Sequence, residues 1–147
     1  MVVMDIEKIF ANFKDESATV VVDFSQHPVV WIGMFKKIIT NHISFKETII
    51  KKIKKDNPEL EEDEIRIAGD IILYSRAWEY IKNVDLSMES HIDALLSLYS
   101  EDLMMALKKS KRHYERYEEY EKCAFIRNII DRINLHQEKF GFPKEET

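Results

Sequence analysis

Five histidines and one cysteine are the side chains of this sequence best suited to metal binding or nucleophilic catalysis. They are His27, His42, His91, His113, His136 and Cys123. No histidine belongs to a Glu-x-x-His pair of the di-iron type or to a His-Glu-x-x-His zinc motif. The sequence also lacks a glycine-rich phosphate loop and a Gly-x-Ser-x-Gly nucleophile elbow. The motifs therefore indicate no particular reaction, and we expect no metal and no other cofactor.

One short segment, Glu89-Ser-His91-Ile-Asp93, gathers three side chains that serve as metal ligands or acid–base groups. On a helix, Glu89 and Asp93 share a face by i,i+4 spacing, whereas His91 points away from both. One helix therefore cannot bring all three to a single ion. An active site built from one of these groups and acids of another helix stays open as a hypothesis. The single cysteine, beside Ala124 in an apolar stretch, is interpreted as a small buried hydrophobic residue.

The composition narrows the class of protein that must position these residues. The 147 residues are 45% apolar and 33% charged, which is typical of one soluble globular domain, with or without an appended hairpin. Three glycines and three prolines are too few for the turns of an all-β sandwich or barrel. A lone cysteine agrees with a reducing compartment, and the sequence shows no secretory signal and no long apolar run. We expect a cytoplasmic protein without membrane contact.

Apolar residues recur at spacings of three and four, which predicts an all-α bundle of five to six helices with short connections. The expected helices cover residues 4–14, 28–43, 44–56, 58–83, 88–107 and 117–140, with a short extended segment at 19–24. Residues 1–100 are predicted to form the bundle core, 101–141 a C-terminal antiparallel helical hairpin packed on it or projecting from it, and 142–147 a frayed tail. The predicted core residues are Trp31, Phe35, Ile39, Ile50, Ile71, Trp78, Leu95 and Leu103.

Several helix boundaries are predicted from local signals. Pro28 suits a first helical position, and Ser44-Phe-Lys-Glu47 matches the capping box that starts a new helix. Asn57 before Pro58 predicts another N-cap, with the acidic run 59–64 in the first turns of the helix, where the macrodipole favours negative charge. Either Asp85 or Ser87 is expected to cap the helix after that. Gly69, inside a helix, predicts a close approach of another backbone.

Charge is strongly segregated along the chain, although the net charge is only −5. Residues 36–55 carry seven lysines and one acid, and residues 56–101 carry three cations and twelve acids. The basic block consists of Lys36, Lys37, Lys46, Lys51, Lys52, Lys54 and Lys55. One hypothesis is that Lys51, Lys52, Lys54 and Lys55 follow a nucleic-acid backbone; the other is a solvated helix face neutralised by the acidic start of the next helix.

Residues 117–133 resemble the second half of the UvrB/UvrC (UVR) motif, and residues 103–133 do so more loosely. The matching residues are Tyr120, Glu121, Ala124, Ile126, Arg127 and Ile130. Cys123 stands in place of an alanine of that motif and Asn128 in place of an aspartate, while Lys111 departs from its apolar first half. The resemblance implies an antiparallel helical hairpin that mediates protein–protein contact. The alternative is that this hairpin packs only onto its own bundle.

These observations favour a non-catalytic interaction protein, an adaptor or regulator that contacts another protein through its C-terminal helices. The expected contact residues are Tyr114, Tyr117, Tyr120, Glu121 and Arg127, because tyrosine and arginine are enriched at interfaces. A nucleic-acid accessory factor that uses the lysine block and a cryptic enzyme with a carboxylate or histidine site are the alternatives. A homo-oligomer is compatible with the sequence. The high lysine and isoleucine content suggests an AT-rich bacterial or phage genome.

Overall fold

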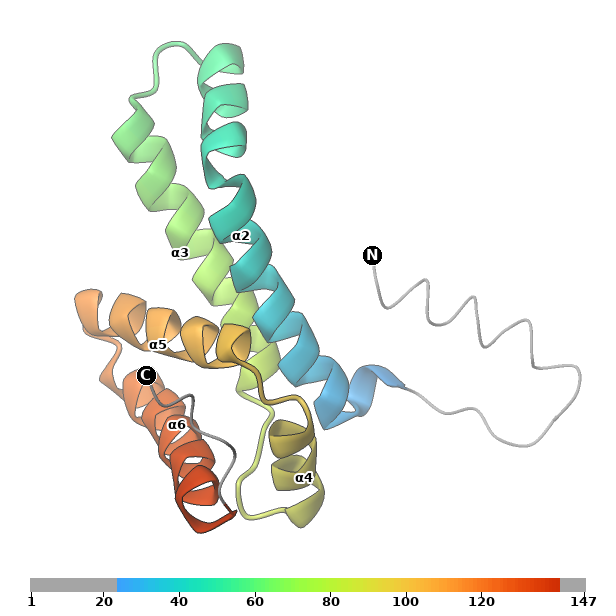
Figure 1. Ribbon diagram of the computed structural model, residues 1–147. Helices are drawn as coiled ribbons and strands as arrows, with labels where there is room; N and C mark the ends of the chain where they lie inside the picture. Colours follow the sequence, from blue (N-terminus) through green and yellow to red (C-terminus); the bar gives the residue numbers. More distant parts are fainter. Residues whose placement is uncertain (1–23, 141–147) are drawn as a thin grey trace, which may run out of the picture.

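Five α-helices and one 3-10 turn make up the regular structure of residues 24–140, the part of the chain that this computed structural model describes (Figure 1). The elements are η1 (Phe24–Gln26), α2 (Pro28–Asp56), α3 (Glu62–Ile81), α4 (Glu89–Ser97), α5 (Glu101–Arg116) and α6 (Tyr120–Phe140). No strand occurs within this range, and the predicted small all-α bundle is confirmed. The expected helix at 4–14, most of the extended segment at 19–24, and the tail at 142–147 lie outside the described residues.

Helix α2 begins at Pro28 as predicted, but it does not break at Ser44. The Nδ1 atom of His27 accepts a 3.1 Å hydrogen bond from the amide of Val29 and caps the helix. The Ser44 hydroxyl donates back to the carbonyl of Thr40 at 3.2 Å, a bond made inside a continuing helix. The prediction that a capping box at Ser44 starts a new helix is therefore wrong, and α2 runs unbroken for 29 residues.

The turn between α2 and α3 also differs from the prediction. Asn57 ends α2 instead of starting α3: its backbone and side-chain nitrogens donate to the Ile53 carbonyl at 2.9 and 3.1 Å. The ammonium of Lys54 donates to the carbonyls of Pro58, at 3.0 Å, and of Leu60, and so closes the turn. Helix α3 then begins at Glu62 with three acids in its first turn, which agrees with the macrodipole interpretation of the acidic run.

The segment predicted as a single helix over residues 88–107 is two helices, α4 and α5. Residues 98–100 separate them, and the Ser100 side chain caps α5 by accepting a 3.1 Å bond from the amide of Leu103. Met88 precedes α4 without a side-chain cap. Asp85, one of the two predicted caps, instead accepts bonds from the backbone and hydroxyl of Ser87 in the preceding turn.

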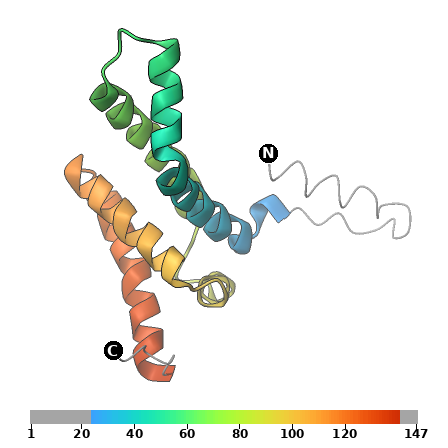
Figure 2. The same ribbon diagram turned by 45° about the horizontal axis from the view of Figure 1, so that its top comes forward.

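Helices α2 and α3 form a long antiparallel pair, and α5 crosses this pair near its base (Figure 1). After α5 the chain turns back, so that α6 lies along α5, while the short α4 sits against the start of α2 (Figures 1 and 2). One hydrophobic core draws residues from all five helices, among them Phe35, Ala77, Leu95, Leu107 and Ile129. The predicted C-terminal hairpin therefore supplies part of the core.

Two expectations for α3, a core position for Ile71 and a close backbone approach at Gly69, are wrong. Ile71, predicted in the core, is 42% exposed, and Ile67 and Ile72 are exposed beside it in sequence. Gly69 has open space where a Cβ would lie, with no atom within 4 Å. No close backbone approach explains that glycine.

The turn from α5 to α6 is a Schellman motif without its usual glycine. The amide of Glu119 donates to the Tyr114 carbonyl at 2.8 Å, and that of Glu118 donates to Glu115 at 3.1 Å. Glu118 has φ = 58°, in the left-handed region that glycine normally occupies. This turn fixes where α6 starts and holds Tyr117 at the end of α5.

Candidate functional site

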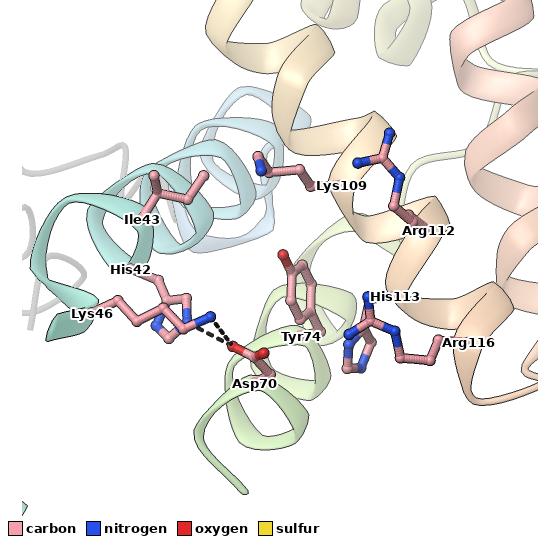
Figure 3. A pocket seen from close by; sticks show the side chains of 9 residues that line it. All are labelled: His42, Ile43, Lys46, Asp70, Tyr74, Lys109, Arg112, His113 and Arg116. Carbon is pink, nitrogen blue, oxygen red and sulfur yellow. Dashed lines mark hydrogen bonds and ion pairs between the residues drawn. The ribbon is translucent and has the colours of Figure 1, made fainter. Parts of the chain in front are cut away.

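A cleft of about 320 Å³ lies between the α2–α3 pair and α5 (Figure 3). Its lining is predominantly cationic, and the residues are His42, Ile43, Lys46, Asp70, Tyr74, Lys109, Arg112, His113 and Arg116. The volume is at the lower end of the range typical of small-molecule pockets. Four cations face one carboxylate, a local net charge of +3 with both histidines counted as neutral, in a chain whose net charge is −5.

Helix α5 supplies most of this positive charge because its cations recur at helical spacing. Lys109, Arg112 and Arg116 stand at i, i+3 and i+7 and therefore share one face, which Figure 3 shows turned toward the cleft. Within residues 24–140, none of the three has a carboxylate partner within 4.0 Å. By contrast, Lys111 on another face of α5 pairs with Glu115 at 2.6 Å.

The opposite wall is organised by Asp70 of α3. Its Oδ1 atom lies 2.9 Å from Nε2 of His42 and 3.4 Å from the ammonium of Lys46, both on α2 (Figure 3). His42 and Asp70 are mostly buried, with side chains 14% and 18% exposed. Asp70 thus holds the imidazole and the ammonium of α2 at the edge of the cleft, and it partly neutralises the ammonium.

Aromatic rings form the floor between these walls. His113 stacks on Tyr74 with ring centroids 4.2 Å apart and an interplanar angle of 20°. Burial lowers the pKa of His113 below its ordinary value of 6.5, so this imidazole is neutral at pH 7. Burial also raises the pKa of the Tyr74 phenol, which keeps its proton. The floor therefore adds polar, uncharged groups to a cationic cleft.

The five predicted contact residues separate into one core residue and four surface residues. Tyr114 is 1% exposed and its hydroxyl donates to the Tyr74 carbonyl, so its assignment to a partner surface is wrong. Tyr117 is 38% exposed and Tyr120 is 64% exposed, and Glu121 and Arg127 are also exposed. The enrichment of tyrosine at interfaces did not distinguish the inward ring of Tyr114 from the exposed rings of Tyr117 and Tyr120.

The lysines predicted to follow a nucleic-acid backbone lie at the tip of the α2–α3 pair and do not line the cleft. Lys51, Lys52 and Lys55 are exposed. Lys54 is half-buried, because its ammonium closes the turn to α3. Of the basic block, only Lys46 reaches the cleft.

The Glu89–His91–Asp93 cluster does not assemble into a site. His91 is buried, accepts a 2.9 Å hydrogen bond from the amide of Asp85, and packs edge-on against Trp31. Glu89 and Asp93 are exposed. Across residues 24–140, no three His, Cys, Asp or Glu side chains gather as metal ligands. Cys123 is buried as predicted, and desolvation raises the pKa of its thiol, which disfavours the thiolate.

Comparison with protein-family models, curated proteins and solved structures finds no match for this chain. Among residues 24–140, no helix combines the length and the apolar character that spanning a bilayer requires. The cleft therefore has to be interpreted from its own geometry and charge.

Proposed function

We propose that this protein binds a phosphate-bearing anion in the cleft between α2, α3 and α5. The observation that carries the proposal is a row of three cations on one face of α5, Lys109, Arg112 and Arg116, which form no ion pair with any other described residue. Like charges three or four positions apart on a helix repel one another, and an anion bound between them would relieve that repulsion. The acids of this protein outnumber its cations, yet among residues 24–140 Asp70 is the only one that lines this cleft.

Arginine favours phosphate over a simple monovalent anion. A guanidinium presents a planar fork of donors that matches two phosphate oxygens, and charge-assisted bonds of this kind are the stronger ones in proteins. Arg112 and Arg116 supply two such forks, and Lys46 and Lys109 add two point charges. Four cations suit a ligand with several negative charges better than a single carboxylate.

Titration calorimetry with inorganic pyrophosphate tests this proposal. We expect saturable 1:1 binding that weakens by about tenfold or more when Arg112→Gln and Arg116→Gln are combined, because each lost bond to a charged group is worth over 1 kcal/mol. The matched control is Lys51→Gln with Lys52→Gln, which removes the same charge from the tip of α2. Equal affinity of the two double variants, or no binding to the wild type, would refute the proposal.

Contact with another protein through α6 is a second candidate function. It is supported by Tyr120, whose large ring is 64% exposed, and by Arg127, which shares its helical face by i,i+7 spacing. The resemblance of residues 117–133 to the UVR hairpin points the same way. The test is a pull-down that compares the amount of partner protein recovered by the wild type, by Tyr120→Ala/Arg127→Glu and by Lys139→Glu. Lys139 is an exposed control position on the same helix. Equal recovery by all three forms would argue against this surface.

A further inference from the structure

We infer that the anion bound in the cleft is part of a nucleotide, and that its unpaired base stacks on Tyr117. The inference rests on the proposed function, since it places the phosphate at the arginines of α5. It adds an aromatic contact that the phosphate proposal does not require. The feature that carries it is a ladder of three rings, formed by Tyr74, His113 and Tyr117.

The ladder runs from the cleft to the surface. Tyr74 and His113 line the cleft and are buried, with ring centroids 4.2 Å apart. Tyr117 continues the series at 4.8 Å from His113, tilted by 46°. It is the exposed member of the ladder. One more flat ring placed on Tyr117 would extend the series into solvent.

The backbone of Tyr117 is held by a hydrogen bond, and its ring is exposed enough to meet a ligand ring. Its backbone amide donates to the His113 carbonyl at 3.2 Å, within the Schellman turn. Among the described residues, its side chain makes one ring contact, with His113, and no hydrogen bond. A ring held this way loses little conformational freedom when a base stacks on it, which favours binding.

The charges around Tyr117 agree with a phosphate on one side of the ring. Arg116, which lines the cleft, is its immediate neighbour in the chain. The nearest acids along the chain that form ion pairs are already neutralised: Glu115 by Lys111 at 2.6 Å and Glu119 by Lys122 at 2.5 Å. Glu118 is the exposed acid without an ion pair in this turn of the described chain. A nucleotide joins its base to its phosphate through one sugar, and Tyr117 contacts His113, which lines the same cleft as Arg116.

The base must be unpaired for this contact. Bases within a duplex are stacked on one another and present only their edges, whereas single strands and free nucleotides expose ring faces for stacking on aromatic side chains. The shared chemistry is therefore a nucleoside phosphate, from a free nucleotide or from a single strand. The experiment has to distinguish these two sources.

Binding of AMP, ribose 5-phosphate and fluorescein-labelled (dA)10 to the full chain tests the inference, with three proteins: wild type, Tyr117→Ala and Tyr117→Phe. We expect Tyr117→Ala to weaken AMP or (dA)10 binding by about fivefold or more, because base–aromatic stacking contributes that much. Ribose 5-phosphate binding should not change, and Tyr117→Phe should restore base binding because it keeps the ring. Circular dichroism confirms that the variants fold.

The possible outcomes distinguish the nucleotide inference from the proposal that the cleft binds phosphate. If ribose 5-phosphate binds and the Tyr117→Ala variant binds both base-containing probes like the wild type, the nucleotide inference fails and phosphate binding stands. If pyrophosphate does not bind to the wild type, phosphate binding itself fails. Among supporting results, (dA)10 binding tenfold or more tighter than AMP indicates a single strand, and equal affinities indicate a free nucleotide.

Discussion

The hydroxyl of Tyr114 on α5 donates a 2.9 Å hydrogen bond to the main-chain oxygen of Tyr74 on α3, across a sequence separation of 40 residues. Their rings also meet edge to face, with centroids 6.3 Å apart. Because Tyr74 lines the cleft, this contact ties the cationic face of α5 to the helix that carries Asp70. Tyr114 does not line the cleft, yet its contact with Tyr74 helps to set the position of α5 relative to α3.

Replacing Tyr114 with phenylalanine should destabilise the protein while leaving the ring packing in place. The substitution removes a buried hydrogen bond, and we expect the free energy of unfolding to fall by about 1 kcal/mol. Urea denaturation followed by circular dichroism measures the change. The control is Tyr120→Phe, which removes an exposed hydroxyl and should leave the stability unchanged. A loss of equal size in both variants would contradict the role of the Tyr114–Tyr74 bond.

Asp70→Asn should strengthen anion binding. Asp70 is the only carboxylate that lines the cleft in the described part of the chain, and its removal raises the local net charge from +3 to +4. We expect pyrophosphate affinity to rise by several-fold at low salt, and the gain to shrink as salt screens the charges. Asp131→Asn on the exposed surface of α6 is the matched control. Weaker binding by Asp70→Asn would mean that the positions of His42 and Lys46 matter more than the removed charge.

The stability of the protein should decrease as the pH falls below about 6.5, and His113 should be one cause. Burial lowers the pKa of His113 in the folded state, with Arg116 and Lys122 acting in the same direction and Asp70 and Glu119 opposing it. The unfolded chain therefore binds a proton at a pH where the folded chain does not, and protonation favours unfolding. His113→Phe, which keeps a ring in the ladder, should flatten this part of the pH profile. Parallel profiles of wild type and variant between pH 7 and 5 would be inconsistent with this assignment.

Glu118→Gly should stabilise the protein. Glu118 has φ = 58°, and a residue with a Cβ is strained in the left-handed region by about 1 kcal/mol relative to glycine. We expect thermal unfolding to shift upward by a few degrees, the shift that a gain of this size gives in a chain of this length. Lys108→Gly, placed in the interior of α5, is the contrasting variant and should lower stability by about 1 kcal/mol. A downward shift for Glu118→Gly would show that the carboxylate itself supports the turn.

The helical class of the fold was predictable because it depends on local spacing, whereas several helix boundaries were not. The spacing of apolar residues needs no tertiary contact to indicate a helix. The Ser44–Glu47 capping box failed because Glu47 pairs with Arg66 of α3 at 2.8 Å, and Ser44 bonds back to Thr40. The N-cap prediction for Asn57 is wrong because an asparagine side chain can also cap the end of a helix, where that of Asn57 donates to the Ile53 carbonyl. Contacts with other helices, and whether the chain enters or leaves a helix at a capping residue, decide these boundaries. Neither can be read from the local sequence.

The candidate site was only partly visible in the sequence. The row Lys109, Arg112 and Arg116 has a helical period that could have been recognised, since all three lie on one face of one helix. The contact of His42 with Asp70 joins two helices across 28 residues, and no local pattern specifies it. Tyr114 was misassigned for the opposite reason: the tyrosines that follow it in the sequence, Tyr117 and Tyr120, are exposed, and only the packing of α5 on α3 shows that Tyr114 is buried.

If the protein binds single-stranded nucleic acid, the salt dependence of binding should identify which cations are used. Each phosphate contact to a single strand contributes about −0.7 to the slope of log affinity against log salt, so the four cleft cations limit the slope to about −3. Arg112→Gln with Arg116→Gln should reduce its magnitude by about 1.4. Charge reversal of Lys51, Lys52 and Lys55 should leave the slope nearly unchanged, because these lysines adjoin the acidic start of α3 and lie outside the cleft. A slope that responds to the tip lysines and not to the arginines would instead place nucleic acid on the tip of the α2–α3 pair, as the lysine-block hypothesis requires.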